Sequence, residues 1–338
     1  MLAGIKRYHS FPAQYNAQHL LPVASIQGST IFGHAAFTNT HKRGQMPLLL
    51  IPSMINGCAI FDIQQTCSLL AYLNNCGVPA YLLDWGDCAD DAGLCDLTDI
   101  AKRLNALSAQ LSEAHNVSGI HGLGYCMGGH FLAAGNALDP GHYASLSFLS
   151  TPWDFAASDY RLAQLIHQLS PAICAHLSVS DYLASQWLHT IFALLAPGQV
   201  LHKFAKFADM PADSNEAALF VAIEDWLNST ASLPHDLAWT VVTQIVQCNA
   251  LAEGALRCDG KPVRAGEMRQ PAHIIAPQHD KIAAPGSVRA LYRQMPDAVL
   301  YTPDCGHIAP MCDRDVQDTL WPDIVERLLN IEDMHNLA

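Results

Sequence analysis

The stretch that decides the fold is Gly124-Tyr125-Cys126-Met127-Gly128. The apolar run 117–123 before it predicts a strand, and residues 129–138 after it have the composition of a helix. In such a strand–turn–helix, small residues two before and two after the central one let strand and helix approach, and the central residue has a strained backbone. The pattern is a nucleophile elbow with cysteine in place of serine, beside a helix N-terminus that favours thiolate. The alternative is a free cysteine in a glycine-rich turn.

Two later residues fit the partners that such an elbow needs. In this kind of fold an acid and then a histidine follow the nucleophile along the chain. Asp280 follows the predicted strand 272–276, and His307 follows the predicted strand 298–301. Taken alone, Asp280 could cap a helix, and His307 is one of seventeen histidines. The order of these residues along the chain, and their position at strand ends, predict a catalytic triad of Cys126, Asp280 and His307.

Attack by Cys126 on a carbonyl would create an oxyanion, which needs backbone donors. The N–H of Met127, directly after the nucleophile, is the expected first donor. A backbone N–H near Ile55, in the loop after an early predicted strand, is the expected second donor.

Strand and helix patterns alternate over much of the chain. Strands are predicted at 46–52, 78–84, 117–123, 144–150, 272–276 and 298–301, and helices at 62–75, 97–114 and 129–138. This alternation implies a mostly parallel sheet with helices on both faces, as in the α/β-hydrolase fold. Between about 156 and 263 the pattern is helical and turn-rich, without a clear strand. We therefore expect one domain over 1–338, with a core of 45–155 and 264–332 and an inserted helical cap or lid of about 156–263.

Composition limits the classes of function. The 338 residues are half hydrophobic, but no uncharged apolar run reaches the ~18 residues of a membrane span. The N-terminus lacks an apolar segment behind its basic residues, which predicts no signal peptide. Eleven scattered cysteines without metal-like spacing then indicate reduced thiols in the cytoplasm and no metal site. The net charge of −13 argues against nucleic-acid binding.

Several separated stretches form a second pattern. They are residues 51–63 with the pair Ile55-Asn56, then Tyr81-Leu82-Leu83-Asp84-Trp85-Gly86-Asp87, Gly124-Tyr125-Cys126-Met127-Gly128-Gly129, Ser150-Thr151-Pro152-Trp153-Asp154-Phe155, Glu224-Asp225-Trp226, Asp280, Gly306-His307-Ile308 and Leu320-Trp321-Pro322. In order and spacing, from about Pro47 to Leu329, they resemble polyhydroxyalkanoate (poly-3-hydroxybutyrate) synthases, particularly the short class III catalytic subunits.

The resemblance implies an acyltransferase that polymerises 3-hydroxyacyl-CoA. Cys126 would attack the thioester, coenzyme A would leave, and an acyl-cysteine would remain. His307, held by Asp280, would then deprotonate the 3-hydroxyl of the growing polyester or of the next monomer. The resemblance implies no cofactor beyond the coenzyme A thioester substrate. It implies a second copy or an accessory synthase subunit as partner, and a cytoplasmic location at polymer granules.

The chain also departs from this family. Lys281 follows Asp280 where the family usually has histidine, Ala309-Pro310-Met311-Cys312 follows Ile308, and roughly the first forty residues match no part of it. Two alternatives therefore stay open. One is a cysteine-nucleophile hydrolase of the same fold, such as a thioesterase, esterase or polyhydroxyalkanoate depolymerase. The other is a catalytically silent partner that binds synthase or granules.

Overall fold

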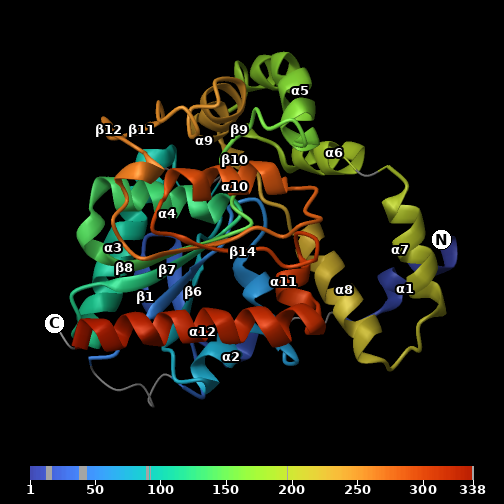
Figure 1. Cartoon of the computed structure of the whole chain (residues 1–338). Helices are drawn as coiled ribbons and strands as arrows, with labels where there is room; N and C mark the ends of the chain where they lie inside the picture. The colour runs from blue at the N-terminus through green and yellow to red at the C-terminus, as the bar shows by residue number, and fades with distance from the viewer. Residues whose placement is uncertain (13–16, 38–43, 89–90, 92, 196, 337–338) are drawn as a thin grey trace.

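An eight-stranded sheet forms the centre of the protein in the computed structural model, which describes residues 1–12, 17–37, 44–88, 91, 93–195 and 197–336 (Figure 1). The strand order is β1-β2-β6-β3-β7-β8-β13-β14. The strands are β1 (Leu20–Ile26), β2 (Ser29–His34), β3 (Leu48–Ile51), β6 (Ala80–Asp84), β7 (Ile120–Tyr125), β8 (Tyr143–Leu149), β13 (Ala272–Ile275) and β14 (Val299–Tyr301). From β6 to β14 all neighbouring strands are parallel, whereas β2 is antiparallel to both β1 and β6.

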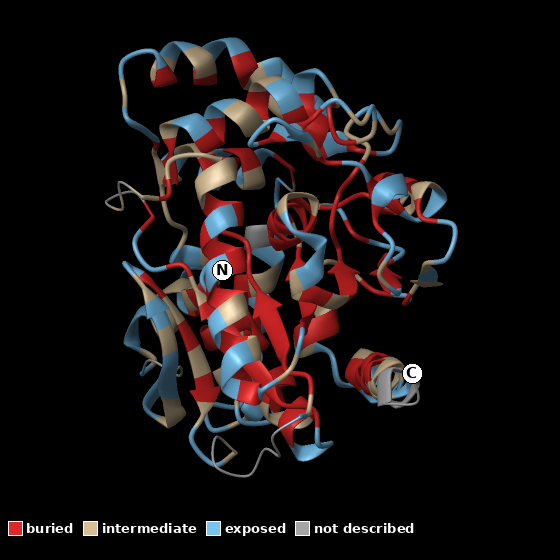
Figure 2. Ribbon diagram, turned by 90° about the vertical axis from the view of Figure 1, so that its left-hand side faces the viewer, coloured by how far each residue is buried: buried red, intermediate tan, exposed pale blue. Residues whose placement is uncertain are grey.

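Alternate residues of each central strand face two different helical layers. In β3, Leu49 and Ile51 pack in one core, whereas Leu48 and Leu50 pack in the other. The first core includes residues of α3 (Leu97–His115), α4 (Met127–Leu138) and α10 (Pro285–Gln294); the second includes α2 (Leu69–Asn75) and α12 (Arg314–Asn336). Burial follows this layering, with buried residues in the strands and on the inner helix faces (Figure 2). The predicted mostly parallel sheet with helices on both faces is confirmed.

One prediction of local structure was wrong, and one pair of strands was not predicted. The helix expected over 62–75 begins only at Leu69, because residues 62–68 form the short hairpin β4 (Asp62–Gln64) and β5 (Cys67–Ser68). The Ser68 hydroxyl accepts from Ala71 N (2.9 Å) and so sets the start of α2. The pair of strands that the sequence patterns did not predict is the β1–β2 hairpin at the sheet edge.

Between β8 and β13 the chain is mainly helical. The helices are α5 (Arg161–Leu177), α6 (Ser185–Leu195), α7 (Gln199–Asp209), α8 (Asn215–Asn228), α9 (His235–Trp239) and the π-helix η4 (Thr240–Gln247). Two pairs of two-residue strands accompany them, β9 (Tyr182–Leu183) with β10 (Leu233–Pro234) and β11 (Arg257–Cys258) with β12 (Lys261–Pro262). Helices α5, α6 and α9 gather at one end of the molecule, at the top of Figure 1.

The N-terminal helix α1 (Leu2–Ser10) lies against α7, away from the sheet (Figure 1). A β-carbon on Gly4 would lie 1.9 Å from the carbonyl oxygen of Phe204, so only glycine allows this approach. Arg7 donates to carbonyls at the end of α7, including Phe207 O (2.8 Å) and Met210 O (2.6 Å). Residues 1–11, α7 and α8 thus form an arm with its own small core.

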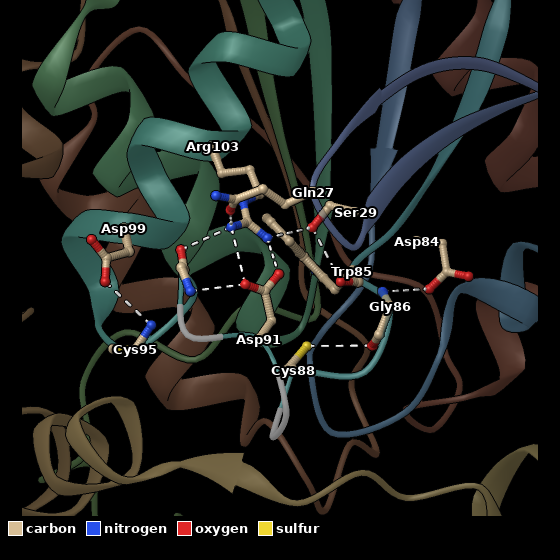
Figure 3. Close-up of polar contacts among 11 residues, drawn as sticks. Gln27, Ser29, Asp84, Trp85, Gly86, Cys88, Asp91, Cys95, Asp99 and Arg103 are labelled. Carbon is tan, nitrogen blue, oxygen red and sulfur yellow. Dashed lines mark hydrogen bonds and ion pairs between the residues drawn. The ribbon is translucent and has the colours of Figure 1, made fainter.

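A buried arginine fixes the loop after β6. Arg103 of α3 is 5% exposed and contacts Asp91 of that loop and Gln27 of the β1–β2 hairpin (Figure 3). It also donates to Ser29 Oγ (3.3 Å), which in turn donates to Trp85 O (3.1 Å). One guanidinium therefore joins a helix, a hairpin and the loop that begins with Trp85.

No helix of the described residues is long and apolar enough to cross a membrane.

Candidate active site

Cys126 lies at a sharp turn between β7 and α4, as predicted. Its backbone has φ 55° and ψ −122°, a strained conformation for a residue with a side chain. The two glycines permit the turn: a β-carbon on Gly124 would lie 2.5 Å from Gly129 Cα, and one on Gly128 would lie 2.1 Å from Ile51 O. The elbow therefore needs glycine at both positions, and it presents Cys126 at the N-terminus of α4.

The structure brings Asp280 and His307 together beside Cys126. His307 Nδ1 lies 2.7 Å from Asp280 Oδ2. The other carboxylate oxygen of Asp280 accepts from Ile282 N and Ala283 N, both at 2.8 Å. Asp280 thus caps a turn before α10, whose N-cap is Ala284, and at the same time binds the imidazole of His307, whereas its catalytic role stays a prediction. His279, which precedes it, is largely exposed and pairs with Asp304 (2.6 Å).

The charges around His307 favour its protonated form. Burial opposes protonation, but the carboxylate of Asp280 and the thiol of Cys126, both hydrogen-bonding partners of the imidazole, outweigh it and raise the pKa of His307 to about 10. Tyr125 supports the imidazole, since its ring centroid lies 5.0 Å from that of His307 and its hydroxyl donates to His307 O (3.2 Å). At neutral pH this arrangement favours an imidazolium beside the sulfur.

The two expected oxyanion donors lie at the same cavity as Cys126. Met127 is the first residue of α4, so its N–H has no partner within the helix. Among the described residues, neither this N–H nor that of Ile55 donates to another group. Both groups are therefore free to bind an oxyanion, a role that remains a prediction.

The loop that carries Ile55 is held by α8 and the residues after it. Asn56 Nδ2 donates to Trp226 O (3.0 Å) and to Thr230 Oγ1 (3.1 Å). Trp226 Nε1 donates to Gly57 O (2.8 Å), and Ala231 N donates to Ile55 O (2.9 Å). Trp85 Nε1 binds the same loop through Pro52 O (3.2 Å). Three of the stretches noted in the sequence therefore meet around one loop: Ile55-Asn56, Glu224-Asp225-Trp226 and Asp84-Trp85-Gly86.

An apolar cavity of about 90 Å³ opens above Cys126. Apolar side chains from α5, α6, α9 and η4 form most of its wall. Two polar side chains also line the cavity. The sequence patterns assigned neither a catalytic nor a binding role to these two residues. They are Tyr160, immediately before α5, and His130, one turn into α4.

Tyr160 lines this cavity, and its hydroxyl has no hydrogen-bonding partner among the described residues. Burial, followed by the charges of Cys126 and Asp280, raises the pKa of Tyr160 well above its usual value, so the hydroxyl stays a donor. His130 Nε2 lies 2.6 Å from Pro152 O, and burial lowers the pKa of His130 to about 4. Its Nδ1 is buried without a partner in the described part of the chain.

Solved structures show the class of fold. A crystal structure of a lipase candidate from Acinetobacter baumannii AYE matches with a TM-score of 0.57 and 15% identity, over 92% of this chain and 93% of that one. The monoacylglycerol lipase of Paleococcus ferrophilus matches with a TM-score of 0.53 and 14% identity, over 90% and 98%. With the sheet order and the elbow, these matches establish an α/β-hydrolase fold.

Sequence relatives are more specific. The chain is 26% identical over 249 residues to the poly(3-hydroxyalkanoate) polymerase subunit PhaC of Allochromatium vinosum, covering 73% of this chain and 69% of that one. It is 24% identical to the subunit of the same name from Thiocystis violacea, over 74% and 72%, and 24% identical to that of Synechocystis, over 84% and 77%. No family model matches the chain. The protein is an α/β-hydrolase-fold protein similar in sequence to PhaC polymerase subunits.

Proposed function

We propose that this protein is an enzyme, a class III-like polyhydroxyalkanoate synthase that transfers 3-hydroxyacyl groups from coenzyme A to a growing polyester. The observation that carries the proposal is a cysteine at the elbow with an Asp280-bound imidazole beside it. The similarity to PhaC polymerase subunits supports this reading over the other activities of the fold.

The first half-reaction is acylation of Cys126. The thiolate attacks the thioester carbonyl, and the N–H groups of Met127 and Ile55 bind the oxyanion. The carbon–sulfur bond to coenzyme A breaks, and the imidazolium of His307 gives its proton to the departing thiolate. Free coenzyme A, an acyl-cysteine and a neutral His307 result, so protons and charges balance.

The second half-reaction lengthens the chain. Acylation removes the thiolate that helped to raise the pKa of His307, so the imidazole becomes a better base towards an alcohol. Neutral His307 takes the proton of a 3-hydroxyl, and the alkoxide attacks the acyl-cysteine. An ester forms, the Cys126 thiolate leaves, and the imidazolium is restored. Asp280 keeps the imidazole in the required orientation throughout.

Chain growth requires that water does not reach the acyl-cysteine first. The helices over the cavity are the part of the molecule that can exclude it, because α5, α6, α9 and η4 line the cavity with apolar side chains. In this proposal the segment of about 156–263 acts as a lid. We propose the cytoplasm, at polymer granules, as its location, with a second copy or an accessory synthase subunit as partner.

The test is incubation with 3-hydroxybutyryl-CoA, with free coenzyme A, polymer and free hydroxy acid all measured. We expect coenzyme A and polymer from the wild type, and neither from Cys126→Ala or His307→Ala. Cys312→Ala is the matched control, because it removes another partly buried cysteine outside the triad. Coenzyme A with free hydroxy acid and no polymer would identify a hydrolase. Absence of all three products would identify a silent binding partner.

A further inference from the structure

The tyrosine before the nucleophile lies against the histidine. Tyr125 ends β7, directly before Cys126, and is 2% exposed. Its ring centroid lies 5.0 Å from that of His307 and 6.0 Å from that of Phe61. Phe61 ends the short helix η2 (Cys58–Phe61), which follows the loop that carries Ile55. The strand that presents the cysteine therefore also contacts the histidine, through the residue next to the nucleophile.

The hydroxyl of Tyr125 holds the segment that carries His307. Residues 302–308 connect β14 to α11 (Ala309–Cys312) without a helix or strand of their own. Tyr125 Oη donates to His307 O (3.2 Å), and among the described residues this is the only hydrogen bond of the His307 backbone. The neighbouring N–H groups of Gly306 and Ile308 donate to no group in the described part of the chain. One hydroxyl therefore fixes the backbone at the histidine.

The ring of Tyr125 favours the charged form of the imidazole. Its plane is inclined by 31° to that of His307, so the two rings are closer to stacked than to edge-on. A cation within about 6 Å of an aromatic ring centroid, over the ring face, is stabilised by the negative charge of that face. Burial, followed by the charges of Cys126 and Asp280, raises the pKa of Tyr125 well above its usual value. The hydroxyl therefore stays a neutral donor at neutral pH.

We propose that Tyr125 is a positioning residue, whose hydroxyl fixes the backbone of His307 and whose ring favours the imidazolium beside Cys126. The effect on the rate rests on the proposed function, whereas both contacts belong to the resting protein. Tyr125 is absent from the described side chains that line the cavity above Cys126. It therefore acts through His307 and not on the acyl group, so its substitution should lower kcat with little change in KM.

The experiment separates the hydroxyl from the ring. Tyr125→Phe removes only the hydroxyl, so kcat for coenzyme A release from 3-hydroxybutyryl-CoA should fall about tenfold, while KM changes less than about twofold. Tyr125→Leu also removes the ring, while Asp280 and Cys126 still face the imidazole. The midpoint of the His307 titration, measured by imidazole NMR, should then fall by about one pH unit, whereas Tyr125→Phe should leave this midpoint unchanged.

Tyr143→Phe is the matched control. Tyr143 is buried (4% exposed) in the other core, and its hydroxyl also donates a hydrogen bond, to Asn105 Oδ1 (2.8 Å). The same atom is therefore removed from a buried tyrosine that has no contact with the histidine. This variant should leave both kcat and the titration of His307 unchanged.

The outcomes separate this inference from the proposed function. A wild-type kcat in Tyr125→Phe, or an equal loss in Tyr143→Phe, overturns the positioning role while coenzyme A release still supports an acyl-cysteine enzyme. A rise in KM alone would show that Tyr125 binds the substrate, and an unchanged titration in Tyr125→Leu overturns the role of the ring. The titration needs no turnover. If the wild type releases no coenzyme A, a lower midpoint in Tyr125→Leu still supports the contact, and only the proposed function is wrong.

Discussion

In the proposed mechanism, both half-reactions depend on the proton that His307 holds. Its pKa of about 10 lies well above the ordinary value of 6.5, so the resting protein at neutral pH has an imidazolium, which in the proposed reaction would protonate the departing coenzyme A. With another residue in place of Cys126, the contribution of the cysteine to this raised pKa would be lost, so cysteine at the elbow favours the imidazolium form of His307.

The pH dependence of His307 can be tested directly. Its folded pKa is higher than its unfolded one, so its contribution to stability is complete below about 6.5 and is lost as pH rises through about 10. The burst of coenzyme A release should fall over the same upper range, because the imidazolium is lost. In Cys126→Ala the contribution of the thiol disappears, so the pKa of His307 should fall while Asp280 still supports it. Imidazole NMR titration measures this shift, and an unchanged titration would contradict the arrangement.

Tyr160 should act on the substrate and contribute little to the fold. Its hydroxyl has no partner among the described residues, so Tyr160→Phe removes no hydrogen bond from the resting protein. We expect kcat/KM for 3-hydroxybutyryl-CoA to fall about tenfold, the value of one hydrogen bond of ~1.4 kcal/mol. The acylation rate with butyryl-CoA, which lacks the hydroxyl, should change little. An equal loss for both thioesters would show that Tyr160 does not bind the 3-hydroxyl.

At the scale of elements, α8 determines the position of the loop that carries Ile55. Trp226→Phe keeps the buried ring and removes only the bond from Nε1 to Gly57 O. If the N–H of Ile55 binds the oxyanion as proposed, the loop would then position this donor less well, and kcat for acylation should fall about tenfold with little change in KM. Trp187→Phe is the matched control, because Trp187 lies on α6, is partly buried against the other core and makes no contact with the Ile55 loop among the hydrogen bonds of the described residues. A change in KM alone would place α8 in substrate binding.

Arg103 contacts three elements, so its substitution should lower the free energy of unfolding. Arg103→Met leaves Asp91 without its buried partner, and we expect the free energy of unfolding to fall by about 3–5 kcal/mol. Arg327→Met is the comparison, since that arginine forms a more exposed pair with Asp323 and should cost about 1 kcal/mol or less. Equal losses in urea unfolding would show that the Arg103 contacts add no special stability.

Across the whole molecule, features encoded within a few consecutive residues could be predicted from the sequence, whereas features that depend on contacts between distant segments could not. Cys126 and its two glycines lie within five residues, so the elbow was visible in the sequence. Tyr160 was not, because only the packing of the α5 region over the sheet brings it to the cavity. The β1 strand was not predicted because it contains Pro22 and all of its residues are exposed or half-buried. The β1 strand is held in the sheet because it pairs with β2, which in turn pairs with β6.

The arm formed by residues 1–11, α7 and α8 has a consequence for synthesis of the chain. The bond from Arg7 to Phe207 O joins residues 200 positions apart, and Tyr8 reaches Asp225 (2.5 Å) across 217. At about 5–20 residues per second, a ribosome needs at least about ten seconds to supply these partners. During that interval the apolar face of the first helix, with Ile5, Tyr8 and Phe11, has no native surface to cover it. The helix thus leaves the ribosome about 200 residues before its partners, and until they arrive a chaperone that binds exposed apolar helices has a surface to bind.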